Sequence, residues 1–500
     1  MSAIGSLLEA ASIVIGFPTI IWIFLGIALG MILGAIPGIG AAIGIAILLP
    51  LSIAMDGSLA IIFFVCMYLG GMYGGSISAV LINTPGTAAA AATTLDGYPL
   101  SKQGLAVNAL TLSALASAIG GMIAITILIA ISPFLTTILL RFGSPEYFMV
   151  AVLGLSMITV IARGSMAKGL MMGAFGLLIS TVGLSNVGGA VRYDMGLRLL
   201  FDGIHFVAVL IGLFAVTEMI KLASREGGIS EEDSEMTGSR RDGIIGVVTR
   251  PVTVLKSAVI GLGIGAIPGA GASVSNFVAY GEAMRADDDP DSFGEGNERG
   301  VIAAEAANSA TVAGSLIPTL SFGIPGSGTT AVLLGALLMH GFRPGPTLFT
   351  EEAVTTYSFF VSLVIGNIII AILGLAVIAY AGYVTKISTD YIVPVIIPLA
   401  IFGGFAMRET MLDVITVVLF GILGYYMVKH DFSIIALVLG VVLGPVAETN
   451  LHRSLQIADG SYLIFIRNPI SLLMVIATVV IIVGPLAKVQ YQKFRGADTA

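Results

Sequence analysis

Apolar stretches almost as long as a bilayer is thick recur along this sequence, and they leave it few possible folds. The first half alone has them at residues 12–33, 59–73, 105–131, 147–161 and 204–220. A membrane-spanning helix needs about 20 such residues, and backbone groups in lipid must be hydrogen-bonded within the chain. Only 11% of the 500 residues are charged, against roughly 25% in soluble domains. The sequence therefore predicts an all-α polytopic membrane protein with about ten to twelve crossings.

Composition also argues against several classes of function. The net charge of −7 and the lack of a basic stripe do not favour a nucleic-acid partner. Cys66 is the single cysteine, so an intramolecular disulfide is impossible and a packing role is expected. The four histidines are scattered, with no metal-binding or catalytic spacing, and no phosphate-binding GxxxxGK[ST] motif occurs. We expect no enzyme activity and no cofactor. Residues 12–33 follow no basic segment, so we expect a retained helix and not a cleaved signal.

The chain divides into two halves around a polar segment. Residues 225–245 are rich in charged and small polar side chains and are expected to form a linker. We therefore expect a first transmembrane repeat at residues 1–224, a second at 246–470, and an extra transmembrane helix and tail at 471–500.

Short motifs recur in the same order in the two halves. "GAIPGIG" at residues 34–40 returns as "GAIPGAG" at 265–271, an offset of 231. "GS" at Gly75 returns at Gly314, an offset of 239, and "TPGT" at residues 84–87 returns as "IPGS", an offset of 240. Duplicated halves around a central site are common in secondary transporters. We favour inverted repeats and elevator-like movement, since alternating access follows from them, although the sequence does not decide the number of crossings between the copies.

Four breaks rich in glycine and proline occupy matched places in the two halves. We call residues 36–40 break 1, residues 83–87 break 2, residues 267–271 break 3 and residues 323–329 break 4. Proline and glycine interrupt helices, and such interruptions at membrane depth occur where the backbone lines a cavity or is buried in protein. Breaks 2 and 4 precede helix-forming stretches that Thr87, Ser327 or Thr329 could cap. Tight surface turns remain the alternative interpretation.

The free N–H groups at such helix starts suit an anion such as a carboxylate. The candidate substrate-binding residues are Asn83, Thr84, Pro85, Gly86 and Thr87 of break 2 and Pro325, Gly326, Ser327, Gly328 and Thr329 of break 4. Unwound carbonyl groups could coordinate a coupling cation such as Na⁺. The helix-break residues considered for that role are Pro37, Gly38, Gly40, Pro268, Gly269 and Gly271. No metal-binding group is assigned.

The motifs that carry these breaks resemble a known family. "GAIPGIG", "YGGSISAVLINTPG", "DGYP", "GIPGSGTTAVLLGALLMHGFRPGP" and "LGPVAETNLHRSL" are similar to the large membrane subunit, TctA type, of tripartite tricarboxylate transporters. The resemblance covers nearly the whole chain, from Gly34 to Leu455. It implies a multi-pass permease of the prokaryotic inner membrane. Its partners would be a small membrane subunit of the TctB type and a periplasmic solute-binding protein of the TctC type, and an ion gradient, commonly Na⁺, would drive carboxylate uptake.

Other interpretations stay open at this level. A stand-alone Na⁺- or H⁺-coupled carboxylate carrier would need no periplasmic partner, and the resemblance does not identify the carboxylate. Glu305 and Asn308 share one helical face. They could join neighbouring helices or line the substrate path. Glu218 and Glu448 end apolar segments and are expected at the membrane interface.

Overall fold

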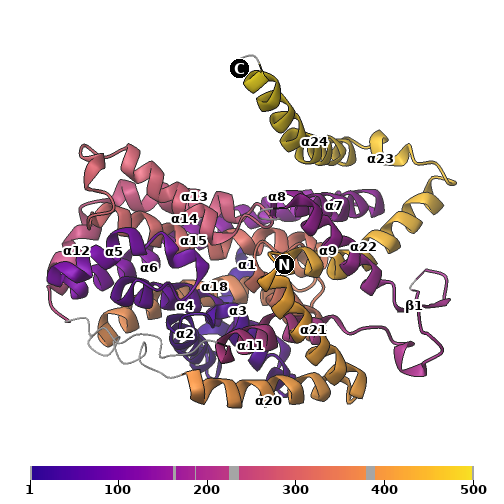
Figure 1. Ribbon diagram of the computed structural model, residues 1–500, viewed down its shortest axis with the longest axis horizontal. Helices are drawn as coiled ribbons and strands as arrows, with labels where there is room; N and C mark the ends of the chain where they lie inside the picture. Colours follow the sequence, from indigo (N-terminus) through magenta and orange to yellow (C-terminus); the bar gives the residue numbers. More distant parts are fainter. Residues whose placement is uncertain (1–2, 162–164, 186, 225–235, 379–388, 498–500) are drawn as a thin grey trace. The chain divides into compact units, whose positions relative to one another are not determined.

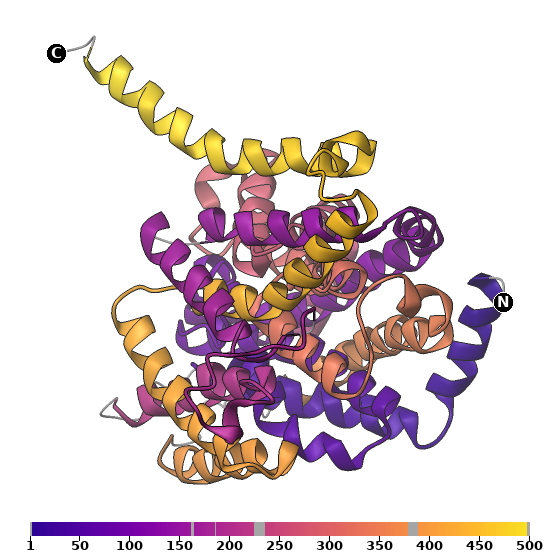
Figure 2. The same ribbon diagram turned by 90° about the vertical axis from the view of Figure 1, so that its right-hand side faces the viewer.

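The structure is a computed structural model that describes residues 3–161, 165–185, 187–224, 236–378 and 389–497. Figures 1 and 2 show that these residues are almost entirely helical. The part of the predicted linker at residues 225–235 lies outside the described residues, and the rest of that linker leads into a helix that starts at Arg240.

Seven helices within the described ranges are long and apolar enough to cross a membrane, or up to nine if each bent pair counts as one span. The predicted all-α polytopic class is confirmed. The predicted number of crossings was higher, because several apolar stretches form helices too short to span, such as Met166–Ser180 and Gly328–Met339.

Contacts divide the chain into two compact units that each draw on both sequence halves. Unit 1 contains Met1–Thr136, Val207–Ser321 and Pro325–Tyr425, and unit 2 contains Thr137–Phe206, Phe322–Ile324 and Tyr426–Ala500. The predicted repeat boundaries at residues 224 and 246 therefore do not coincide with these units.

The helices that lie wholly or mainly in unit 1 come from three stretches of the chain. They are α1 (Ala3–Ile15), α2 (Thr19–Ala35), α3 (Gly40–Leu48), η1 (Pro50–Ala54), α4 (Gly57–Ile82), η2 (Ala88–Ala91), α5 (Thr94–Leu100), η3 (Ser101–Leu105), α6 (Ala106–Leu139), α10 (Phe206–Leu210), η5 (Ile211–Val216), α11 (Thr217–Ala223), α12 (Arg240–Val248), α13 (Pro251–Gly265), α14 (Gly271–Arg285), η6 (Pro290–Ser292), α15 (Glu298–Phe322), α16 (Gly328–Met339), α17 (Pro346–Thr350), α18 (Ala353–Val377), α20 (Thr389–Arg408) and α21 (Met411–Lys429).

Unit 2 is smaller and includes the one short hairpin of the described residues. Its elements are α7 (Ser144–Ser156), α8 (Ile158–Ile161), α9 (Met166–Ser180), β1 (Gly183–Leu184), β2 (Val191–Arg192), η4 (Arg198–Leu200), α22 (Ile434–Ile457), α23 (Ile464–Arg467) and α24 (Pro469–Ala497).

The expected continuous helix at residues 12–33 is wrong. The chain forms α1 and α2, which meet at an angle of 75°. Gly16 and Pro18 lie at the bend, and proline has no N–H to continue the helical hydrogen bonds. By contrast, the stretch predicted at residues 59–73 lies inside the longer α4, which begins where Asp56 Oδ1 accepts the N–H groups of Ser58 and Leu59 at 3.0 and 3.2 Å.

Glycine lets the helices of unit 1 approach closely, and it does so at equivalent positions of the two halves. A Cβ atom added to Gly30 of α2 would lie 2.3 Å from the carbonyl oxygen of Met67 in α4. One added to Gly261 of α13 would lie 2.4 Å from the carbonyl oxygen of Ala307 in α15. These residues are related by offsets of 231 and 240, as 261 − 30 and 307 − 67. Thus α13 packs on α15 through the same positions as α2 packs on α4.

A second pair of contacts refines the predicted correspondence. A Cβ atom on Gly74 would lie 2.2 Å from the Met31 carbonyl oxygen, and one on Gly314 would lie 2.4 Å from the Leu262 carbonyl oxygen. Gly74, and not Gly75, therefore occupies the place of Gly314. The offset in α4 and α15 is 240 throughout, and the 239 obtained from the "GS" motif was wrong by one residue.

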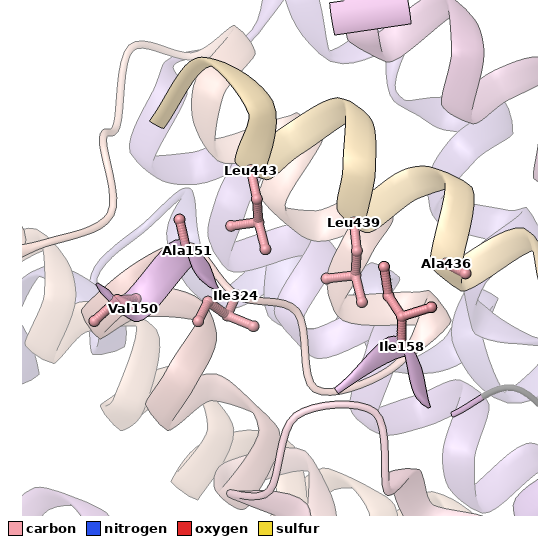
Figure 3. Packing of buried hydrophobic residues seen from close by; sticks show 7 residues of the cluster. All are labelled: Val150, Ala151, Ile158, Ile324, Ala436, Leu439 and Leu443. Atoms are coloured by element: carbon pink, nitrogen blue, oxygen red, sulfur yellow. The ribbon is translucent and has the colours of Figure 1, made fainter. Parts of the chain in front are cut away.

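The core of unit 2 forms where α22 packs against α7 and α9. Ala436, Leu439 and Leu443 lie on one face of α22 and point toward Ala151 and Ile158 (Figure 3). Ile324, from the start of break 4, is only 3% exposed and belongs to the same cluster. The first residues of break 4 are therefore part of the unit 2 core, and the residues from Pro325 onward belong to unit 1.

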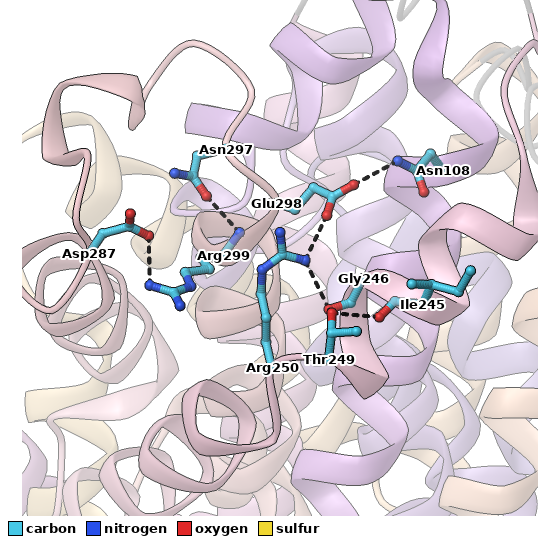
Figure 4. Close-up of polar contacts among 9 residues, drawn as sticks. All are labelled: Asn108, Ile245, Gly246, Thr249, Arg250, Asp287, Asn297, Glu298 and Arg299. Carbon is cyan, nitrogen blue, oxygen red and sulfur yellow. Dashed lines mark hydrogen bonds and ion pairs between the residues drawn. The ribbon is translucent and has the colours of Figure 1, made fainter.

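A polar cluster at the start of α15 ties this helix to α6 and to Arg250, which lies between α12 and α13 (Figure 4). Glu298 accepts hydrogen bonds from Asn108 Nδ2 at 3.0 Å and from Arg250 Nη1 at 2.7 Å. In the adjoining loop Arg299 pairs with Asp287 at 3.0 Å. Burial works against ionisation of Asp287, but the backbone N–H of Asp289 and the Arg299 ion pair hold its pKa below the usual value.

Candidate functional site

Breaks 1 and 2 meet in unit 1. Gly86 of break 2 lies against the end of α2, where an added Cβ atom would be 1.9 Å from the Gly34 carbonyl oxygen. Its backbone N–H donates to the carbonyl oxygen of Gly75 at 3.1 Å. Gly40, at the start of α3, lies beside Thr87 at a would-be Cβ distance of 3.7 Å. The chain thus folds two breaks, more than 40 residues apart in sequence, onto one another.

Breaks 3 and 4 meet in a comparable way. The backbone N–H of Gly269 donates to the Gly326 carbonyl oxygen at 3.1 Å. A Cβ atom on Gly326 would lie 2.8 Å from Ser315 Cβ in α15 and 3.2 Å from the Gly265 carbonyl oxygen at the end of α13. Gly326 therefore packs against α13 and α15 in the same way as Gly86 packs against α2 and α4.

These two pairs of breaks are connected through the middle of unit 1. Helix α3, which follows break 1, packs against α16, which follows break 4. The Tyr68 hydroxyl of α4 lies 3.1 Å from Ser315 Oγ and 3.4 Å from Ser327 Oγ. The structure thus brings the predicted site residues of unit 1 into one region, and the starts of α3, α14 and α16 lie at its breaks.

Only one of the three hydroxyl residues considered as helix caps has that role. Ser327 Oγ accepts the N–H of Thr330 at 3.2 Å, and Thr330 Oγ1 accepts the N–H of Ser327 at 2.8 Å. Thr330, and not Thr329, completes this capping box. Thr87 makes no capping hydrogen bond, because break 2 leads into the four-residue 3-10 helix η2 and not into an α-helix. Its Oγ1 atom is buried and has no hydrogen-bond partner among the described residues.

Positive backbone dihedral angles explain the glycines of breaks 1 and 3. Gly38 has φ +90° and Gly40 φ +60°, and their counterparts Gly269 and Gly271 have φ +76° and +65°. Asn83 also adopts the left-handed region, with φ 52°, where it ends α4. Glycine and asparagine are the residues that tolerate this conformation.

Helix packing explains why break 2 has glycine at position 86. Gly86 and Gly326 are among the candidate substrate-binding residues that the sequence suggested. In the structure their missing side chains would point at backbone and side-chain atoms of neighbouring helices. These two glycines hold the breaks against α2, α4, α13 and α15, and their role in substrate binding stays a prediction. The polar side chains of breaks 2 and 4 that are not fully buried are those of Asn83, Thr84, Thr87, Ser327 and Thr329.

An ion pair that the sequence did not reveal lies beside break 1, with its carboxylate toward the break. A Cβ atom on Gly38 would lie 3.4 Å from Glu218 Oε1, and Glu218 Oε2 pairs with Lys221 Nζ at 2.6 Å. Lys221 lies 183 positions from Gly38 in the chain, so no local motif could reveal its position.

The fold and the breaks define the class of this protein as a polytopic helical membrane protein with discontinuous helices. Residues 20–439 match the model of the tripartite tricarboxylate transporter TctA family. The chain belongs to this family, whose members are components of transporters and not enzymes. The match begins in α2, so it includes all four breaks.

Two proteins of Agrobacterium vitis are similar to this chain. One, described as an uncharacterized 52.8 kDa protein in the TAR-I ttuC' 3' region, is 33% identical over 476 residues, 93% of each chain. The other, described as an uncharacterized protein in the TAR-II ttuC' 3' region, is 32% identical over 208 residues, 42% of this chain and 86% of the relative. No solved structure matches the chain.

Proposed function

We propose that this protein is the large permease subunit of a binding-protein-dependent secondary transporter that imports a tricarboxylate or dicarboxylate. The observation that carries the proposal is the family match over residues 20–439, which spans the region where the four breaks converge. A small membrane subunit of the TctB type and a periplasmic solute-binding protein of the TctC type would complete the system. Its location would be the inner membrane of a prokaryotic cell.

Residues at the breaks would bind the carboxylate. The N-terminus of α16, capped by Ser327, offers N–H groups at the positive end of a helix. Asn83 could donate from its amide. The recurrence of the α2–α4 contacts in α13–α15 supports an internal duplication. Inverted repeats and elevator-like movement remain part of this proposal.

An ion gradient would drive transport, since the sequence has no ATP-binding loop of the GxxxxGK[ST] type and secondary transporters use ion gradients. The coupling ion proposed here is Na⁺. The second candidate function is a stand-alone Na⁺- or H⁺-coupled carboxylate carrier. It is favoured by the fact that all four breaks, apart from the residues of 323–324, lie within unit 1 of this one chain.

Uptake into proteoliposomes tests the proposal. We expect entry of radioactive citrate or succinate only when this chain, the small membrane subunit, the periplasmic protein and an inward Na⁺ gradient are all present. Omitting the periplasmic protein should reduce uptake to the level of protein-free vesicles, and replacing Na⁺ by K⁺ should do the same. Undiminished uptake by this chain alone would contradict the proposed function and favour the stand-alone carrier.

A further inference from the structure

A buried carboxylate in unit 1 has hydroxyl groups, and no basic side chain, as its partners. Glu305 lies near the middle of α15 and its side chain is 0% exposed. Its Oε1 accepts a hydrogen bond from Thr93 Oγ1 at 2.5 Å, and its Oε2 accepts one from Ser117 Oγ at 2.7 Å. Within the described part of the chain, no Lys, Arg or His pairs with it.

Two further hydroxyl groups lie beside this carboxylate but make no well-aligned hydrogen bond to it. Ser76 of α4 and Ser113 of α6 interact with Glu305. Their Oγ atoms are nevertheless buried and without a hydrogen bond of good geometry to any described residue. Buried hydroxyl oxygens are rarely left in this condition. The lone pairs of these oxygen atoms can therefore coordinate a cation.

A monovalent cation would balance the charge of Glu305 and would be coordinated by the oxygen atoms around it. Burying an isolated carboxylate is very unfavourable, and one positive charge neutralises it. A divalent ion would leave a net charge in the same buried place. Carboxylate and hydroxyl oxygens are the ligands that hard cations such as the alkali and alkaline-earth ions prefer. Thr93, Ser76, Ser113, Ser117 and Glu305 together offer six such oxygen atoms.

We propose that Glu305 and the hydroxyls of Ser76, Thr93, Ser113 and Ser117, which we call the Glu305 site, bind a monovalent cation. The inference rests on the proposed function, because it gives the coupling ion a site distinct from the break residues Pro37–Gly40 and Pro268–Gly271 that the sequence suggested.

The Glu305 site also has a physical connection to the carboxylate-binding region. Thr93 follows break 2 by six residues, directly after η2. On α15, Asn308 lies one turn beyond Glu305, and its Nδ2 donates to the Met72 carbonyl oxygen of α4 at 2.9 Å. A cation bound at Glu305 would therefore hold the segment after break 2 against α15 and α6. When the site is empty, the uncompensated charge would favour separation of these elements, which couples the cation to the break.

Cation binding to the purified protein tests this inference without any substrate. We expect saturable binding of radioactive Na⁺ to the wild-type protein, and a melting temperature that rises with NaCl but not with KCl. Glu305→Gln keeps the size and shape of the side chain, but it removes the charge and replaces one of the two accepting oxygens with an N–H donor group. It should bind Na⁺ about tenfold or more weakly, as expected for the loss of a charged contact. Ser76→Ala with Ser113→Ala should weaken binding several-fold while Glu305 remains.

Glu146 provides a matched control because it is a second buried carboxylate, 3% exposed, with a complete set of donors. Gly143 N–H, Asn468 Nδ2 and Ser471 Oγ donate to it at 2.9, 3.0 and 2.6 Å. Glu146→Gln should leave Na⁺ affinity unchanged. If Glu305→Gln does not fold, Thr93→Val and Ser117→Ala test the same site.

The same variants distinguish Na⁺ from a proton as the bound cation. If the site binds a proton, Na⁺ will not affect the wild-type protein, and the melting temperature will depend less on pH in Glu305→Gln than in the wild-type protein. The inference is overturned if Glu305→Gln retains the Na⁺ and pH responses of the wild-type protein, or if the wild-type protein has neither response. Failure of carboxylate uptake with intact cation binding would instead count against the proposed function.

Discussion

Replacing Gly86 with valine is expected to remove most of the folded protein from the membrane. The new Cβ atom would lie 1.9 Å from the Gly34 carbonyl oxygen and 2.9 Å from Gly75 Cα, both backbone atoms of packed helices. Backbone cannot rotate away as a side chain can, so α2 and α4 must separate or break 2 must move. Overpacking of a well-packed interior destabilises a protein by about 1–3 kcal/mol. Because the new side chain meets backbone on two sides, we expect a destabilisation of about 3 kcal/mol or more for this variant.

Size-exclusion chromatography after detergent extraction measures this effect as the yield of monodisperse protein. The matched control is Gly281→Ala in α14, where an added Cβ atom has no neighbour within 4 Å. We expect a normal yield for the control and little or none for Gly86→Val. A Gly86→Val protein that extracts normally but does not transport would contradict the packing role and restore the interpretation that Gly86 faces the ligand.

Replacing Asp96 with alanine is expected to release the loop between α14 and α15. Asp96 is 0% exposed, and its Oδ1 accepts the backbone N–H groups of Gly294, Gly296 and Asn297 at 2.8, 2.9 and 2.8 Å. Each buried donor left unpaired costs about 1–3 kcal/mol, although water can replace part of the loss in a loop. We therefore expect a total destabilisation of about 3 kcal/mol.

Hydrogen exchange detects the change where it occurs. The amides of Gly294, Gly296 and Asn297 should lose their protection in Asp96→Ala, and the melting temperature should fall. Asp291→Ala is the control, because this exposed carboxylate lies in the same loop and surface substitutions change stability by about 0.5 kcal/mol or less. Unchanged exchange of the three amides in Asp96→Ala would show that other contacts hold the loop.

The helical membrane fold could be predicted because its signals are local. Apolar runs, the glycine–proline breaks and the recurring motifs are all visible within short windows of the sequence. Ser327 was correctly recognised as a helix cap, since a cap depends on residues three positions apart. The prediction of a continuous helix at residues 12–33 was wrong because the apolar pattern was given more weight than Pro18. This proline interrupts the helical hydrogen bonds between α1 and α2.

Contacts over long sequence distances could not be predicted. Glu305 was visible as an unusual carboxylate in an apolar segment, but its partners Thr93 and Ser117 lie 212 and 188 positions away. Glu218 lies beside Gly38 of break 1 although the two residues are 180 positions apart in the chain. The packing role of Gly86 was missed, because a sequence does not distinguish a glycine that admits a ligand from one that admits a neighbouring helix.

The claim that break 4 lies at the carboxylate-binding site is tested most directly by substrate protection of a cysteine at Ser327. The background is Cys66→Ser, which removes the single native thiol, itself 0% exposed. Ser327→Cys is compared with Ser433→Cys, since both serines cap helices and both are half-buried. Each protein is reconstituted with its partner subunits and alkylated with a small maleimide in Na⁺, with and without saturating citrate or succinate.

If the carboxylate binds at break 4, one of these two substrates should slow alkylation of Ser327→Cys severalfold and leave Ser433→Cys unchanged. Equal rates for Ser327→Cys with and without both substrates, in a preparation that transports one of them, would contradict the account and leave break 4 as a structural turn.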